Sequence, residues 1–177
     1  MTPADEQAFT EFAVASRTRL RRTAYLMCGD WDRAGDHVQE ALVRVYLRWP
    51  RLQRQGGELA YARRAVASVV IDESRRRSSR ELPAPPDPTR ATTEDVAAAV
   101  TDRAALLAAL GGLAPRQRAC VVLRYFEELD VRETAAVLGC SEGTVKSQTS
   151  RALAALRSTF ESASRDELAH HVIGRQR

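Results

Sequence analysis

The stretch DVRETAAVLGCSEGTVKSQTSRALAALR, residues 130–157, holds two short helical patterns that flank a Gly-Cys-Ser break. Asp130 and Glu133 have the spacing of a capping box at the start of a helix, and Gly139 favours the left-handed conformation that ends one. Ser141 can cap the second helix. The apolar face of that helix is formed by Val145, Ala152, Leu153 and Leu156. Two helices joined by a tight glycine turn predict a helix-turn-helix, whose second helix enters the major groove of DNA.

The outer face of this second helix is polar. Its hydroxyl, amide and cationic side chains can hydrogen-bond bases or phosphates. The candidate DNA contacts are Thr144, Lys146, Ser147, Gln148, Ser150 and Arg151. The alternative is a helical hairpin in an all-α core with a solvated polar face. The small Ala135 at the helix crossing, the glycine turn and the serine cap together favour DNA binding.

Length and charge set broad limits. The chain has 177 residues, enough for one or two small domains, and is mildly basic with a net charge of +4. Residues 61–80 contain six arginines against Asp72 and Glu73, so this segment alone carries as much net charge as the whole chain. A localised basic stretch indicates contact with a polyanion.

Several functional classes are disfavoured. The chain has three cysteines, an odd number, and their spacing is not that of metal ligands: Cys28, Cys120 and Cys140. We therefore expect neither a disulfide framework nor a metal site, and we expect the protein to reside in a reducing cytoplasm. We find no signal-peptide run and no apolar stretch of membrane-spanning length, so no membrane insertion is expected. The chain also lacks a Walker loop, a convincing carboxylate pair and a Cys/His cluster, which argues against an enzyme or a cofactor.

Apolar residues at helical spacing predict two helices in the N-terminal part. The first begins at Pro3, behind Thr2 as N-cap, and runs to about Met27. The second spans roughly residues 31–49. Its apolar stripe consists of Ala34, Val38, Ala41, Leu42, Val45 and Trp49. Its opposite, polar face presents Asp36, Gln39, Glu40, Arg44 and Arg48, which the sequence alone would leave as a solvated surface.

A loop is predicted at residues 50–57, and a third helix begins at Glu58 with a basic flank. Arginines along a helix can follow phosphates, each contact adding salt-dependent affinity; a merely solvated arginine face is the alternative. The basic flank consists of Arg63, Arg64, Arg75, Arg76, Arg77 and Arg80. Residues 81–93 then hold four of the seven prolines and predict a semi-extended linker.

Helical patterns resume at Glu94 and stop at Gly111, and Pro115 opens the next helix. The expected core side of that helix is Ala119, Val122, Leu123 and Phe126. The sequence therefore predicts an all-α chain of two small helical domains joined by a proline-rich linker. The N-terminal domain is 1–80, the linker 81–93 and the C-terminal domain, ending in the helix-turn-helix, 94–160; a short tail, 161–177, continues as helix or frays.

Three features in fixed order carry a family resemblance: a helix containing DHVQEALVRVYLRW, a basic helix containing YARRAVASVVIDESRRR, and the helix-turn-helix after LAPRQRACVVLRYFEEL. This order resembles bacterial RNA polymerase sigma factors of the extracytoplasmic-function type, above all the actinobacterial SigE-like group, over about residues 9–160. The resemblance implies a non-catalytic, cytoplasmic initiation factor, nucleoid-associated when bound to polymerase. Such a factor recruits core RNA polymerase, melts the −10 region and reads the −35 region.

The resemblance also implies roles for particular residues. Core-polymerase binding, to the β′ clamp helices, falls on Asp36, Gln39, Glu40 and Arg44. Binding of the −10 element falls on the 50–57 loop and the helix after it, at Arg54, Gln55, Arg63, Arg64, Ser68, Arg75, Arg76 and Arg77. Reading of the −35 element falls on the six recognition-helix residues named above. The implied partners are core polymerase, including its β flap, promoter DNA and an anti-sigma factor, and the free chain is expected to be a monomer.

The chain departs from the family pattern at four positions. His37 and Ser68 stand where relatives often carry leucine and asparagine. Gln148 replaces a common arginine, and glutamine favours adenine where arginine favours guanine. Thr149 replaces a common aliphatic residue. Two other functions stay open: a helix-turn-helix regulator that binds an operator without polymerase, and a degenerate sigma mimic that sequesters a regulator; a hydrolase is a distant third.

Overall fold

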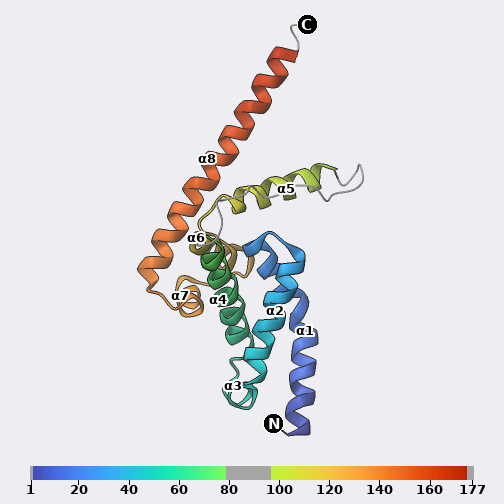
Figure 1. The fold of residues 1–177 in the computed structure, drawn as a ribbon. Helices are drawn as coiled ribbons and strands as arrows, with labels where there is room; N and C mark the ends of the chain where they lie inside the picture. Colours follow the sequence, from blue (N-terminus) through green and yellow to red (C-terminus); the bar gives the residue numbers. More distant parts are fainter. Residues whose placement is uncertain (1, 79–96, 175–177) are drawn as a thin grey trace.

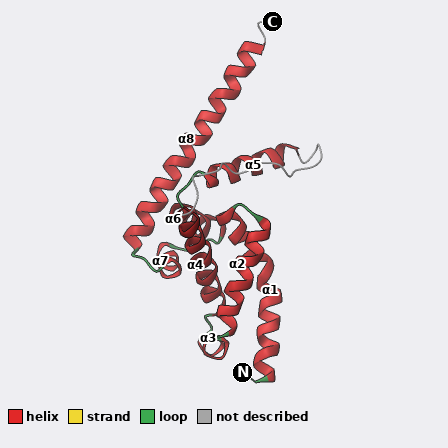
Figure 2. Cartoon of the chain, in the orientation of Figure 1, coloured by secondary structure: helices red, strands yellow, loops and turns green. Residues whose placement is uncertain are grey.

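The computed structural model describes residues 2–78 and 97–174, and the side chains of residues 2–52, 56–77 and 103–162. Within these ranges the chain is built of helices and short turns, without a strand, which confirms the all-α prediction (Figure 2). Residues 79–96, which contain the whole of the predicted linker and the residue Glu94, lie outside the described residues. The boundary between two domains therefore stays a prediction.

The N-terminal helices start and end where their capping signals predict. Helix α1, Pro3–Cys28, begins behind Thr2, which forms a capping box with Asp5, and ends at Gly29 in the left-handed conformation at φ 77°. Helix α2, Trp31–Tyr46, is capped by the Asp30 carboxylate, which accepts from the backbone N–H groups of Asp32 and Arg33. Helix α4, Glu58–Ser78, is the predicted basic helix.

The predicted loop at residues 50–57 is wrong, because helix α3, Trp49–Gln55, occupies most of it. Pro50 is the second residue of this helix. Proline has no backbone N–H, but an N–H in the first turn has no partner inside the helix, so no helical hydrogen bond is lost. Trp49 and Leu52 are buried, which gives the short helix an apolar anchor. Gly56, at φ 63°, ends it. The second predicted helix thus stops at Tyr46 instead of reaching Trp49.

The C-terminal half contains five helical segments. Helix α5 is Ala97–Gly111, helix α6 is Pro115–Val121, and a π-helical turn, η1, is Val122–Phe126. Helix α7, Val131–Leu138, and helix α8, Glu142–Gly174, form the predicted helix-turn-helix. Beyond that motif α8 continues as one long helix that projects from the body of the molecule (Figure 1).

The expected core position of Phe126 is wrong: its side chain is 43% exposed, whereas Ala119, Val122 and Leu123 are buried as predicted. The cause is η1, where the Glu127 N–H reaches back five residues to the Val122 carbonyl at 3.0 Å. One extra residue per turn rotates the following side chains away from the 3.6-residue pattern. Phe126 consequently turns outward, and Glu127 turns inward.

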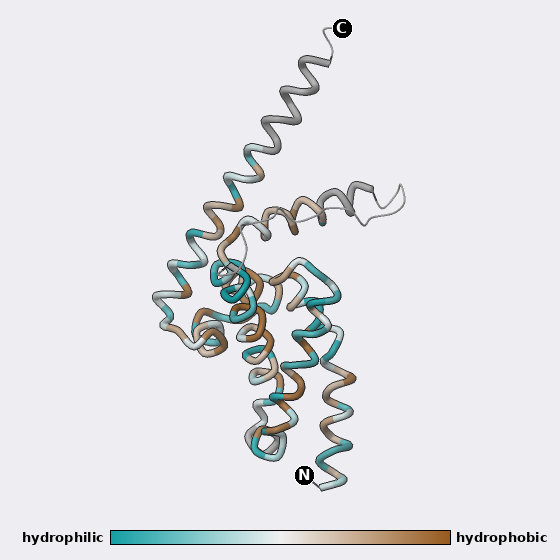
Figure 3. Tube along the Cα trace, in the orientation of Figure 1, coloured by the Kyte–Doolittle hydropathy of each residue, from teal (hydrophilic) through white to brown (hydrophobic). Residues whose placement is uncertain are grey.

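Helix α4 lies at the centre of the packing. It contacts α1 and α2 on one side and α6 and α7 on the other (Figure 1). One apolar cluster joins residues of both halves of the chain, including Leu20 of α1, Val66 of α4 and Leu123 of η1. Hydrophobic residues accordingly concentrate along the inner sides of these helices (Figure 3). The two halves are packed together in this structure.

Candidate functional site

The outer face of α2 presents the predicted polymerase contacts. Asp36, Gln39 and Glu40 are exposed, and Arg44 is partly exposed. The Arg44 Nη2 lies 2.5 Å from the Glu40 Oε1, a pair one helical turn apart. This face therefore combines fixed charges of both signs with groups that are open to a partner.

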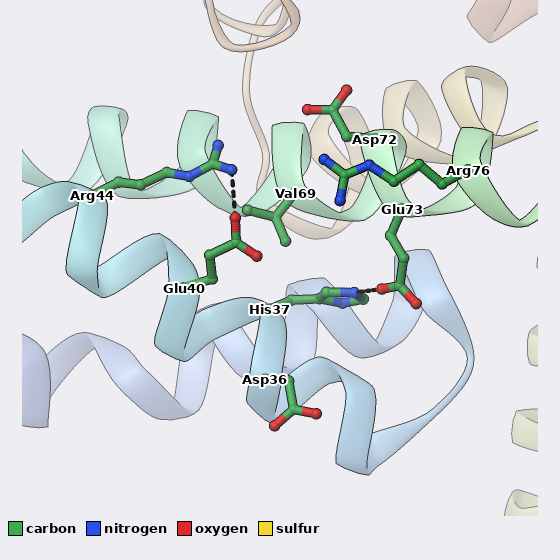
Figure 4. A pocket seen from close by; sticks show the side chains of 8 residues that line it. All are labelled: Asp36, His37, Glu40, Arg44, Val69, Asp72, Glu73 and Arg76. Atoms are coloured by element: carbon green, nitrogen blue, oxygen red, sulfur yellow. Dashed lines mark hydrogen bonds and ion pairs between the residues drawn. The ribbon is translucent and has the colours of Figure 1, made fainter.

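A charged contact beneath this face joins α2 to α4. His37 is buried, and its Nε2 contacts Oε2 of Glu73 on α4 (Figure 4). Arg33 Nη2 lies 3.0 Å from Glu73 Oε1. Burial alone would raise the pKa of Glu73, but the hydrogen bond with His37 and the positive charge of Arg33 outweigh it, so the Glu73 pKa is below its usual value. Glu73 is thus held as a carboxylate that fixes α2 against α4.

A hollow of about 230 Å³ opens between these two helices (Figure 4). Its lining is mostly charged, and the described residues contain no group of side chains able to hold a metal ion. The lining consists of Asp36, His37, Glu40, Arg44, Val69, Asp72, Glu73 and Arg76. Three of the four predicted polymerase contacts therefore share one polar depression.

The basic side chains of α4 fall into two groups. Arg75, Arg76 and Arg77 are exposed near the C-terminal end of the helix. Arg63, by contrast, has a side chain only 13% exposed, because it turns toward the C-terminal half. Arg64, although exposed, lies against the turn of the helix-turn-helix, with its Nη2 3.8 Å from where a Cβ on Gly139 would stand.

The structure describes fewer contacts for the remaining residues predicted to bind the −10 element. The half-buried Ser68 donates its hydroxyl to Asp72 Oδ2 at 3.2 Å, a bond within α4 itself. Arg54 and Gln55 belong to α3, but their side chains lie outside the described residues, as does Arg80.

The helix-turn-helix has the predicted local geometry. Asp130 and Glu133 complete a capping box, and Gly139 is left-handed at φ 61°. The Thr144 N–H donates to Ser141 Oγ at 3.1 Å, which caps α8. Val145 and Ala152 are fully buried, and Ala152 belongs to an apolar cluster with residues of α5 and α6. These caps fix the direction in which α8 leaves the turn.

The predicted −35 residues divide between two environments. Lys146, Ser147, Ser150 and Arg151 are exposed on α8. Thr144 and Gln148 are half-buried and line a small hollow together with Ile71 of α4. The structure therefore leaves most of the recognition face open and turns one edge of it toward the N-terminal half.

Glu127 is a charged residue that the sequence interpretation missed. Its side chain is 0% exposed and lies between the two halves of the chain. Arg19 Nε and Arg63 Nε lie 3.0 and 2.8 Å from its Oε2, and the Thr23 hydroxyl donates to Oε1. Arg19 and Glu127 are 108 residues apart, so no local signal in the sequence pairs them.

The cysteines do not form a reactive centre. All three are free thiols. Burial raises the pKa of Cys120 to about 11, which keeps this thiol protonated at neutral pH. Burial likewise raises the pKa of Cys28.

In the described part of the chain no helix has both the length and the apolar character needed to cross a membrane.

Comparison with known families matches both halves of the chain. Residues 13–80 match Sigma-70 region 2, and residues 103–156 match Sigma-70, region 4. The first match covers α2 and α4 with their polar and basic faces. The second covers the helix-turn-helix.

Individual relatives agree with these matches. The chain is 40% identical over 158 residues to an RNA polymerase sigma-E factor of Streptomyces avermitilis, covering 89% of this chain and 88% of that protein. It is 33% identical over 150 residues to the ECF RNA polymerase sigma factor SigL of Mycobacterium tuberculosis, covering 80% and 82%. In fold it is similar to the sigma factor RpoE of Bartonella quintana, solved in complex with the anti-sigma factor NepR, with a TM-score of 0.68 at 20% identity over 88% of this chain and 98% of that one.

Proposed function

This chain belongs to the sigma-70 family of bacterial RNA polymerase sigma factors, within its extracytoplasmic-function type, and from that premise we propose how its surfaces share the work of initiation. As a sigma factor it binds core RNA polymerase, recognises −35 and −10 promoter elements and promotes DNA melting. The observation that carries this function is the presence of region 2 and region 4, in that order, on one chain. Phosphodiester bond formation belongs to the polymerase.

The polar face of α2 is the proposed polymerase contact. Asp36, Gln39 and Glu40 are exposed there, and Arg44 borders the same hollow as two of them. The contact from Glu73 to His37 beneath this face supports the assignment, because it holds α2 rigidly against α4. A rigid charged surface loses little conformational freedom when a partner docks.

The basic helix and the recognition helix are the proposed promoter contacts. On α4, Arg75, Arg76 and Arg77 are exposed cations that suit the phosphates of the −10 element, while Arg63 and Arg64 lie nearer the C-terminal half. The remaining −10 candidates are Arg54, Gln55 and Ser68. On α8 the six recognition residues would read the −35 element, and the cations Lys146 and Arg151 are both exposed there.

The domain division and the partners complete the proposal. Residues 1–80 would act on polymerase and the −10 element, residues 94–160 on the −35 element, and 81–93 would connect them. Core RNA polymerase, through its β′ clamp helices and β flap, and promoter DNA are the partners, with an anti-sigma factor restraining the free chain. Because bacterial transcription takes place in the cytoplasm, the protein acts there, at the nucleoid when bound to polymerase.

Run-off transcription tests this function. Purified core polymerase would be supplied with a library of promoter fragments, with and without this protein. New transcripts that start downstream of a shared −35/−10 pattern are expected. If the protein binds core polymerase but starts no transcript, it is a degenerate factor; if it binds DNA without core polymerase and starts none, it is a helix-turn-helix regulator.

A further inference from the structure

Glu127 occupies the junction between the two halves of the chain. It comes from the C-terminal half, directly after η1, yet all three of its donors belong to the N-terminal half: Arg19 and Thr23 of α1, and Arg63 of α4. Its carboxylate is completely shielded from water. A buried carboxylate is stable only when it is well compensated, so these donors are a requirement of the closed arrangement.

The same contact engages a proposed promoter-binding group. Arg63 is one of the proposed −10 phosphate contacts, and its guanidinium lies 2.8 Å from Glu127 Oε2. Carboxylate and phosphate both pair with guanidinium through charge-assisted hydrogen bonds. Glu127 therefore occupies the Nε–H of Arg63, and a phosphate that pairs with this group must displace Glu127.

A second observation points the same way. Thr144 and Gln148, at one edge of the recognition helix, line a hollow together with Ile71 of α4 and Arg116 of α6. Arg64 of α4 lies against the Gly139 turn on the same side. In the packed arrangement, groups of α4 proposed to bind the −10 element thus lie beside groups proposed to bind the −35 element.

We propose that Glu127 is an internal competitor of promoter phosphate: it holds Arg63 and Arg19, keeps the two halves closed and lowers the affinity of the free chain for DNA. Release of Glu127 frees both arginines and exposes the inner edge of the recognition helix in one step. This inference rests on the proposed function for the identity of the DNA, but the closure itself is a property of the free chain.

The test is a DNA titration of the full-length chain, with Glu127→Gln as the variant. A short fluorescent duplex of mixed sequence serves as the probe, followed by anisotropy at several salt concentrations. Opening should raise the affinity about 3- to 10-fold, as expected when the binding-competent fraction rises by that factor. The slope of log affinity against log salt should steepen by about 0.9 for each arginine that gains a phosphate.

The matched control is Glu128→Gln. Glu128 is the next residue, is exposed and undergoes the same change of charge, but it makes no contact across the halves among the described side chains. It should change the affinity by less than about 2-fold, the effect of one surface charge. Adding Arg63→Ala to the Glu127→Gln variant should remove the part of the gain that Arg63 contributes and lower the salt slope by about 0.9. Equal gains in the two glutamine variants, or no gain in Glu127→Gln, would overturn the proposal.

Two further measurements distinguish failure of this proposal from misfolding of the variant and from failure of the proposed function. If circular dichroism shows that Glu127→Gln does not fold, Thr23→Val is used in its place. The Thr23→Val substitution removes one donor to Glu127 without a change of charge, and the same outcomes support or overturn the proposal. Small-angle X-ray scattering of the free variants should show a larger radius of gyration than that of the wild type. A wild type that fails in run-off transcription defeats the proposed function, whereas an unchanged radius in the variants defeats the closure.

Discussion

Thr149 shows what a single buried hydroxyl contributes to the C-terminal half. It lies on α8 among the buried residues, and its Oγ1 is buried without a hydrogen-bond partner among the described residues. A buried polar atom without a partner carries a desolvation penalty. The position therefore has the environment of an aliphatic residue while carrying a polar one.

Thr149→Val should raise the free energy of unfolding by about 1 kcal/mol, because valine keeps the shape and removes the unpaired hydroxyl. Thermal unfolding followed by circular dichroism would measure the difference. Ser150→Ala, at the neighbouring exposed position, is the control and should stay within about 0.5 kcal/mol. A loss of stability in Thr149→Val would mean that the hydroxyl has a partner.

Glu73 makes a prediction about pH. Because its pKa is lowered in the folded chain, its carboxylate stabilises the fold above its ordinary pKa, and this stabilisation is lost as pH falls through the lowered value. Glu73→Gln should cost about 1 kcal/mol at neutral pH, a small figure because the side chain is 33% exposed.

The difference between wild type and Glu73→Gln should shrink as pH falls from about 5 to about 3. Thermal unfolding at several pH values would follow it. Glu161→Gln, an exposed carboxylate on α8, provides the baseline for loss of one surface charge. A difference that is independent of pH would remove the Glu73 contacts to His37 and Arg33 as its source.

At the scale of elements, local signals decided how much could be predicted. Capping residues lie within three or four positions of the helix ends that they fix, so the starts of α1 and α7 and the end of α7 at Gly139 were predicted correctly. Pro50 is ambiguous, since proline both breaks helices and begins them. The π-turn of η1 leaves no trace in a 3.6-residue pattern, and the roles of Phe126 and Glu127 were missed for that reason.

The turn between α7 and α8 can be tested by a pair of alanine substitutions. Gly139→Ala should cost about 1 kcal/mol, because a side chain is strained at its φ of 61°. Gly143→Ala, inside α8 and with only ordinary contacts around a new Cβ, should be neutral or slightly stabilising. Chemical denaturation would compare the two, and equal effects would contradict the left-handed turn.

At the scale of the whole molecule, packing between distant segments brings the functional groups together. The proposed polymerase contact depends on α2 and α4 being held side by side, and the junction at Glu127 depends on α1, α4 and η1 meeting at one point. Neither arrangement follows from hydrophobic periodicity, which predicts the inner face of a helix but does not predict which other helix packs against that face. Only the family resemblance assigned a partner to the polar face of α2.

Gln39→Ala should weaken binding to core RNA polymerase several-fold and leave the melting temperature unchanged, because Gln39 is exposed and belongs to the proposed docking surface. Titration of fluorescent core polymerase with the full-length chain would measure it. Gln7→Ala, at an exposed glutamine of α1, is the matched control. Equal affinities for the two variants would place the polymerase contact elsewhere.

The π-turn also makes the junction depend on chain length as well as on residue type. An α-helix advances by about 100° for each residue, and the π-turn already holds one residue more than an α-turn between Val122 and Glu127, so inserting a further residue into η1 would rotate everything after it by about that angle. Glu127 would then turn away from Arg19 and Arg63. Deleting one residue from η1 would instead turn it into an α-turn and keep Glu127 facing inward. A one-residue insertion at this point would uncouple the halves while every side chain of the junction remained in the sequence.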